Sequence, residues 1–165
     1  MTVLVTYLSL SGQTKKIAEA IYEEIETEKE IKPISEVENL EGYDFAFIGT
    51  PVHSFGPDNN VRMFLKKQAK GKKIAMFVTH AMPPGMEMLK GILAKCKKAA
   101  NQANLIGFFD CQGEMAEDIA KSLMESGNPQ LAQFGKMREV TIGHPDADEI
   151  YNARIFAKEI MEKVK

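Results

Sequence analysis

Tryptophan is absent from this chain, and cysteine occurs only twice, at Cys96 and Cys111. The separation of these two residues fits neither a CxxC redox pair nor a set of zinc-finger ligands. A disulfide framework and a structural zinc site are therefore not expected. Sparse, unpaired cysteine is typical of a reducing compartment, so we expect a cytoplasmic protein.

The chain also lacks a surplus of charge of either sign. Its formal net charge is -2 at pH 7, and its isoelectric point is about 6.0. A domain that binds nucleic acid normally carries a basic face or stripe. We therefore expect no nucleic-acid partner.

Long hydrophobic runs are missing as well. No apolar stretch approaches the roughly 18 residues that a membrane-spanning helix needs. The first residues, MTVLVTYLSLSG, show neither a basic leader nor a cleavage-like site, so we expect no membrane association. A length of 165 residues, with 44% hydrophobic and 27% charged, is that of one ordinary globular domain.

Short apolar runs, by contrast, recur along the chain. They have the unbroken hydrophobic character of strands that are covered on both faces, whereas half-exposed strands alternate. They lie at residues 3–8, 45–50, 74–79 and 105–111, with a weaker run at 31–34. Amphipathic helices are predicted around Ile17 and Ile21, after Asp58, around Leu89 and Leu93, and from Asp146 onward.

Strands that alternate with helices at this spacing require right-handed crossovers between parallel strands. The sequence therefore predicts an α/β fold, with a doubly wound five-stranded parallel sheet and helices on both faces. No linker or repeat divides the chain, so residues 1–165 are expected to form a single domain.

One stretch, at about residues 113–140, does not fit this alternation. Met115, Ile119 and Leu123 follow a helical pattern, and the GNPQ that follows indicates a break. We interpret this extra helical and loop segment as an elaboration after the fifth strand. Such elaborations often carry what is particular to a protein.

In a doubly wound sheet, ligands bind beyond the carboxyl ends of the strands. The first strand ends in SLSGQT, residues 9–14, directly before a helix. A helix N-terminus presents unpaired N–H groups, the hydroxyls of Ser9, Ser11 and Thr14 add donors, and Gly12 permits close approach. This pattern predicts a phosphate site without a cation, although neither GxxxxGK[ST] nor GxGxxG is present. The alternative is that Ser11 only caps the helix.

These segments resemble those of the flavodoxin-like FMN-binding family. YLSLSGQTKKIAEAI is similar to that family's phosphate-binding loop, IGTPVHSFGP to its first flavin-ring loop, FVTHAMPPG to its second, and FDCQGEM to the segment after the fifth strand. Outside about residues 115–140, the resemblance covers most of the chain. It implies the strand order 2-1-3-4-5 and an FMN cofactor that transfers one or two electrons.

The resemblance also implies which residues bind the cofactor. The phosphate-binding residues are Ser9, Leu10, Ser11, Gly12, Gln13 and Thr14. The flavin ring is expected between two loops, with contacts from Thr50, Pro51, Val52, His53, Phe55, Gly56, Thr79, His80, Ala81 and Met82. No residue is assigned a catalytic or metal-binding role. The implied partner is a redox protein or an NAD(P)H-linked reductase.

Two features depart from an electron-carrying flavodoxin, which commonly places Tyr or Trp against the ring and is strongly acidic. Neither ring loop contains Tyr or Trp, and the net charge is nearly neutral. This leaves room for an FMN-dependent oxidoreductase in place of a simple electron carrier. His53 or His80 could hydrogen-bond the flavin or move protons, or both could be inert loop residues.

Two other functions fit the same residues. A binding or regulatory module could keep the fold and the anion-accepting loop without a flavin, because fold does not fix function. A metal-assisted hydrolase would recruit His53, His80, Asp110 and Cys111, a mixed set that suits zinc. These ligands are scattered singly along the chain, however, and no HxxxH or CxxC pair anchors them.

Overall fold

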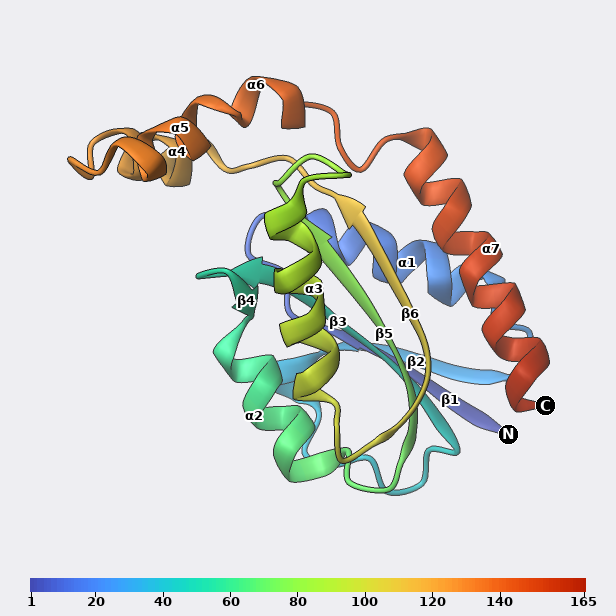
Figure 1. The fold of residues 1–165 in the computed structure, drawn as a ribbon. Helices are drawn as coiled ribbons and strands as arrows, with labels where there is room; N and C mark the ends of the chain where they lie inside the picture. Colours follow the sequence, from blue (N-terminus) through green and yellow to red (C-terminus); the bar gives the residue numbers. More distant parts are fainter.

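A twisted parallel sheet forms the centre of the computed structural model, which describes every residue from Met1 to Lys165 (Figure 1). Its main strands are Thr2–Tyr7 (β1), Glu28–Pro33 (β2), Phe45–His53 (β3), Lys73–His80 (β5) and Asn104–Gln112 (β6). They lie in the order β2-β1-β3-β5-β6, and all neighbouring pairs on this path are parallel. Counted without the short strand β4, this is the predicted order, and the doubly wound α/β class is confirmed.

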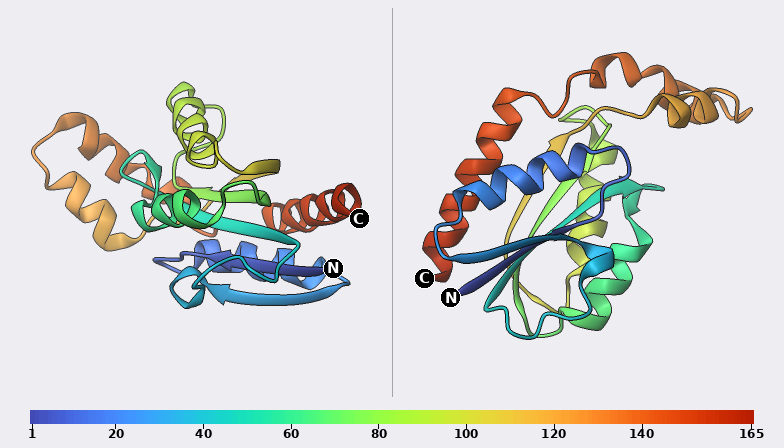
Figure 2. Two further views of the ribbon diagram at one scale, coloured as in Figure 1. Left: turned by 90° about the horizontal axis from the view of Figure 1, so that it is seen from below. Right: turned by 180° about the vertical axis from the view of Figure 1, so that it is seen from behind.

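Helices cover both faces of this sheet (Figures 1 and 2). Successive side chains of a strand point to opposite faces, and the two sides of β1 therefore enter two separate cores. Helices α1 (Gln13–Glu24) and α7 (Ala147–Val164) cover one face. Helices α2 (Asn59–Gln68) and α3 (Glu87–Ala99) lie on the other (Figure 1).

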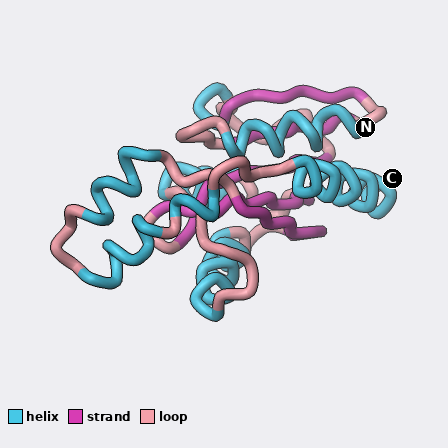
Figure 3. Tube along the Cα trace, turned by 90° about the horizontal axis from the view of Figure 1, so that it is seen from above, coloured by secondary structure: helices cyan, strands magenta, loops and turns pink.

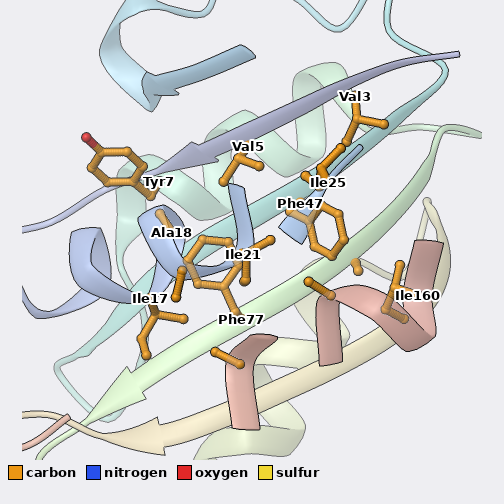
Figure 4. Close-up of a cluster of buried hydrophobic side chains, with 14 of the residues drawn as sticks. Val3, Val5, Tyr7, Ile17, Ala18, Ile21, Ile25, Phe47, Phe77 and Ile160 are labelled. Atoms are coloured by element: carbon orange, nitrogen blue, oxygen red, sulfur yellow. The ribbon is translucent and has the colours of Figure 1, made fainter. Parts of the chain in front are cut away.

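The core under α1 and α7 is the larger of the two (Figure 4). Ile17 and Ile21 of α1 share it with Val5 and Phe47 of the sheet and with Ile160 of α7, and all five side chains are buried. The opposite core contains Leu4, Ile48, Val61, Leu65 and Met76. The predicted helical face of α1 is therefore the one that packs on the sheet.

Gly49 shows how tightly the sheet is covered. A Cβ atom at this position would lie 2.2 Å from Cε2 of Phe77, on the neighbouring strand β5. Because the Phe77 ring fills the space that a side chain would occupy, β3 needs a glycine within its otherwise apolar run.

The boundaries of two strands differ from the prediction. Strand β2 begins at Glu28, ahead of the apolar run at 31–34, because it is an edge strand whose side chains are largely half-exposed. Strand β3 continues to His53 and pairs antiparallel with a two-residue strand, β4 (Gly56–Pro57), which the apolar pattern did not indicate.

The residues between β6 and α7 form the helices α4 (Glu117–Met124), α5 (Pro129–Lys136) and α6 (Arg138–Thr141). Figures 2 and 3 show α4 and α5 as a hairpin that projects away from the sheet. The side chain of Asn128 accepts a hydrogen bond from the backbone N–H of Gln130 at 2.9 Å, and Pro129 opens α5. The GNPQ segment is therefore a break, as predicted, and also the start of the next helix.

Helix α7 begins as the sequence predicts. Asp146 caps it by accepting from the backbone N–H of Glu149 at 3.0 Å, and the Glu149 carboxylate accepts in turn from the N–H of Asp146 at 2.9 Å. None of the helices combines the length and the hydrophobicity needed to cross a membrane.

Candidate functional site

The loop after β1 turns sharply into α1 at Gly12, whose φ of 91° lies in the left-handed region that favours glycine. Gly12 is the N-cap, and α1 begins without a side-chain cap. The alternative that Ser11 caps the helix is therefore wrong. Instead, Ser9 Oγ accepts from the backbone N–H of Gly12 at 3.1 Å and, more weakly, from that of Lys15 at 3.3 Å.

Several backbone donors of this loop have no acceptor in the protein. The N–H groups of Ser9, Leu10 and Ser11 make no hydrogen bond to another residue. Ser11 is exposed, and a Cβ at Gly12 would meet nothing within 4 Å. The loop thus presents free N–H groups to open space at the positive end of a helix dipole, which is an arrangement that binds anions.

Gln13 and Thr14, which end the SLSGQT segment and begin α1, connect this helix to the neighbouring strands. Thr14 Oγ1 and Thr79 Oγ1, at the end of β5, are 2.8 Å apart in a buried hydrogen bond. Gln13 packs against Gly113, just beyond β6, where an added Cβ would lie 3.1 Å from that of Gln13. The buried Oε1 of Gln13 has no hydrogen-bond partner. The predicted phosphate loop therefore adjoins the ends of β5 and β6.

The first predicted ring loop is fixed by Thr50 and Asp58. The buried Thr50 hydroxyl accepts from the backbone N–H of Asp58 at 3.0 Å and donates to the carbonyl of Pro51 at 2.8 Å. The carboxylate of Asp58 then caps α2 by accepting from Asn60 N–H at 2.8 Å, and its other oxygen lies 3.3 Å from Nδ1 of His53. These bonds therefore hold the two ends of the loop together.

Ser54 and Phe55 form the tip of this loop, between β3 and β4. Their φ values are 54° and 62°, the positive values that the two central residues of a type I′ hairpin turn require. Neither residue is glycine, so the turn holds backbone strain of a kind that concentrates at functional sites. Phe55 is 40% exposed, while Gly56 is buried and Pro51 and Val52 are half-buried.

His80 holds the second predicted ring loop in place by hydrogen bonds, and its side chain is only 1% exposed. Its Nδ1 lies 2.7 Å from the carbonyl oxygen of Met82, and its Nε2 lies 2.9 Å from Oδ2 of Asp110. Gln112 Nε2 donates to the carbonyl of Ala81 at 3.0 Å. The ring nitrogens of His80 thus bind the protein, whereas the side chains of Ala81 and Met82 remain half-buried at the edge.

The four residues of the metal alternative do not share a site. His53 pairs with Asp58, while His80 pairs with Asp110. Cys111 is buried, and desolvation raises the pKa of its thiol well above the usual range. A zinc ion requires several ligands around one point, and of these four side chains only those of His80 and Asp110 contact each other.

A different cluster, of His144, Asp146 and Glu149, brings its ligand atoms within 4.8 Å of one another. Glu149 is already engaged, because its carboxylate accepts from His144 Nδ1, from Asp146 N–H and from the backbone N–H of Gln112 at 2.9 Å. The sequence signal for this cluster is the capping box at the start of α7. We interpret this cluster as a structural one that connects the end of β6 to the start of α7.

A cavity of about 340 Å³ opens on the other side of the phosphate loop, toward β2. It is lined by Ser9 and Gly12 of the loop, by Lys15 of α1, and by Pro33 and Ser35, among others. The cavity does not reach the two predicted ring loops. The loop after β1 therefore borders this cavity and, through Thr14 and Thr79, also borders the second predicted ring loop.

Comparison with known proteins decides the family. The family described as Flavodoxin domain matches residues 4–158. The chain belongs to the flavodoxin family. This flavodoxin-family chain is also 36% identical, over 173 aligned positions, to the flavodoxin-like domain-containing protein BilS of Clostridioides difficile, a match that covers 99% of this chain and 98% of the relative.

Solved structures agree with this assignment at the level of the fold. A flavodoxin from the domain Archaea has a TM-score of 0.63 at 18% identity and covers 99% of both chains. A WrbA-like flavodoxin from Agrobacterium tumefaciens has a TM-score of 0.62 at 18% identity, covering 99% of this chain and 96% of its own. A flavoprotein from Lactobacillus acidophilus in complex with FMN has a TM-score of 0.54 at 24% identity, covering 66% of this chain and 92% of its own.

Proposed function

We propose that this protein binds FMN noncovalently at the carboxyl edge of its sheet and takes part in electron transfer in the cytoplasm. The observation that carries the proposal is the 2.8 Å contact between the hydroxyl oxygens of Thr14 and Thr79, which joins the phosphate loop to the second ring loop. Membership of the flavodoxin family supports the same cofactor. So does the FMN complex of the Lactobacillus flavoprotein, which shares the fold.

The phosphate loop fits the terminal group of FMN. Its free N–H groups at residues 9–11 and the open space around Gly12 suit a ligand that accepts several hydrogen bonds. The nearest cation, Lys15, is exposed and lies 4.0 Å from its helix neighbour Glu19. Neutral amides and the helix dipole would therefore hold the phosphate, without a dedicated charge partner.

The two ring loops fit the flat, largely apolar isoalloxazine. Val52, Phe55 and Met82 present partly exposed apolar side chains at one edge of the sheet, and ligand sites of this size are lined mainly by such groups. When bound, FMN supplies one- or two-electron transfer at its ring. The residues of the chain itself bind the phosphate, orient the ring and exclude water from its faces.

Binding is tested by titrating the purified protein with FMN and with riboflavin while following visible absorbance and flavin fluorescence. We expect FMN to bind and riboflavin, which lacks the phosphate, to bind far more weakly. Ser11→Glu should abolish FMN binding, because it places a negative charge at the free amides. Gln102→Glu adds the same charge to an exposed turn before β6 and is the matched control. A wild-type protein that retains no FMN overturns the proposal and favours a flavin-free binding module.

Electron transfer is tested with the FMN-loaded protein and its proposed class of partner. NADPH and a flavodoxin reductase should bleach the flavin absorbance in the absence of oxygen, and oxidised cytochrome c should restore it while becoming reduced. Bound flavin that exchanges electrons with neither protein would refute the carrier role and leave only cofactor binding.

A further inference from the structure

We propose that the α4–α5 hairpin is part of the flavin site and that Phe134, on α5, supplies an aromatic side chain to it. This inference rests on the proposed function and adds a specific residue to the ring site. The ring of Phe134 lies 5.7 Å from that of Phe55, at an interplanar angle of 59°. A segment outside the sheet therefore meets the tip of the first ring loop.

Phe55 does not pack in the hydrophobic core, and its side chain is available to contact a ligand. It occupies a strained position, with a φ of 62°, and it stays 40% exposed even with Phe134 beside it. Backbone strain of this kind concentrates at functional sites, and here it holds Phe55 beside a second aromatic side chain, that of Phe134. A flat aromatic ligand is the natural occupant, since aromatic rings stack or meet edge to face over such distances.

The placement of Phe134 is set by the packing of the hairpin. A Cβ atom on the next residue, Gly135, would lie 2.6 Å from the carbonyl oxygen of Ala120 and 2.8 Å from Cγ of Met124. Helices α4 and α5 thus touch at their backbones, which fixes the rotation of α5 about its axis. That rotation directs Phe134 toward Phe55.

The base of the hairpin is anchored at the edge of the sheet where the ring loops lie. Just after β6, Glu114 N–H donates to the carbonyl of His144 at 2.7 Å, and Met115 N–H donates to Thr141 Oγ1 at 2.9 Å. Arg138 Nε donates to the carbonyl of Met115 at 3.1 Å. These bonds clamp the entering and leaving chains together, and the hairpin projects from that clamp in Figures 1 and 3.

The core does not account for the hairpin. Ile119 and Met124 on α4 are 49% and 46% exposed, and Val140 on α6 is 58% exposed. A segment that only stabilised the domain would bury such side chains. The aromatic contact to the ring loop is the feature that connects the hairpin to a site.

The test is a double-mutant cycle on flavin affinity with Phe55→Ala, Phe134→Ala and the double variant. We expect each single variant to weaken FMN binding roughly tenfold, and the double variant to lose less than the product of the two. Riboflavin affinity should fall by the same factor, because the phosphate loop is untouched. Ile119→Ala, on the exposed side of the hairpin, should bind like the wild type.

Phe134→Leu keeps an apolar side chain of similar length and separates loss of the aromatic ring from loss of hairpin structure, which circular dichroism monitors. It should reproduce most of the Phe134→Ala effect. Unchanged affinity in both Phe134 variants, with wild-type binding intact, overturns the inference. Tighter binding also overturns it, since Phe134 would then obstruct the site. Absence of binding in the wild type is instead the failure of the proposed function.

Discussion

Nε2 of His80 lies 2.9 Å from Oδ2 of Asp110, and this contact joins the ends of β5 and β6 beneath the second ring loop. The other ring nitrogen, Nδ1, lies 2.7 Å from the carbonyl of Met82. A backbone carbonyl only accepts hydrogen bonds, so Nδ1 donates to Met82, and Nε2 is left to bond the carboxyl group of Asp110. His80 thus serves as a brace that shapes the loop from within.

Removing this brace should destabilise the protein. We expect His80→Ala to lower the free energy of unfolding by about 1–3 kcal/mol, because it removes a buried side chain and leaves the Met82 carbonyl and the Asp110 carboxyl group without their partner. His53→Ala is the control: its side chain is 57% exposed, and Asp58 keeps its bond from Asn60 N–H. The control should change stability by less than about 0.5 kcal/mol. Urea unfolding measures both, and equal losses would contradict the distinction.

Two glycines should respond in opposite directions to alanine. Gly49→Ala forces a Cβ to within 2.2 Å of the Phe77 ring and should destabilise the protein by about 1–3 kcal/mol. Gly91, inside α3, has nothing within 4 Å of the same atom, so Gly91→Ala should stabilise by about 0.5–1 kcal/mol through helix propensity. Thermal unfolding of the two variants checks this, and a shift of the same sign in both would count against the packing at Gly49.

Both thiols should be inert in the folded protein. Desolvation raises the pKa of Cys96 to about 11 and that of Cys111 further, so the reactive thiolate is scarce. At mildly alkaline pH, we expect iodoacetamide to label each cysteine at least roughly a hundredfold more slowly than in urea. The variants Cys96→Ala and Cys111→Ala isolate the two rates. Rapid labelling of either native thiol would show that its surroundings open readily.

The contact between α1 and α7 should weaken in acid. Hydrogen bonds from Arg154, and next from Lys158, hold the pKa of Glu24 below its ordinary value of 4.5. A depressed carboxyl pKa stabilises the fold above the unfolded-state value, and this contribution is lost as the pH falls through the folded-state value.

Arg154→Gln should therefore be less stable than the wild type at neutral pH, and the difference should be small because the pair is partly exposed. The gap should close on acidification below the ordinary carboxyl range. Urea unfolding across that range measures it. A gap that widens in acid would assign the effect of Arg154 to something other than its carboxylate partners.

Much of the fold followed from local pattern. Unbroken apolar runs located four of the main strands, although β6, at one edge of the sheet, is mostly half-buried. The weak signal at 31–34 became β2, the other edge strand, which also has half-exposed side chains. Asp146 predicted the start of α7 because a capping box is complete within four consecutive residues. Strand β4 escaped prediction, since a two-residue strand has no periodicity to detect.

The sequence predicted where the candidate site lies in the fold but not the contacts among its residues. The segment SLSGQT predicted a turn between β1 and α1 that presents free amides, because a polar turn between a buried strand and a helix is a local feature. The sequence left open whether Ser11 caps the helix. The structure gives that position to Gly12 and uses Ser9 Oγ to accept from the loop amides.

By itself, the sequence determined the succession of strands and helices along the chain and the edge at which the loops gather, since periodicity and turn chemistry act between near neighbours. Only the tertiary structure decided that His80 would bind Asp110 and that Phe134 would reach Phe55. Partners so far apart in the chain meet only once the sheet has fixed where its strands end and the clamp after β6 has aimed the hairpin. No local pattern encodes that placement.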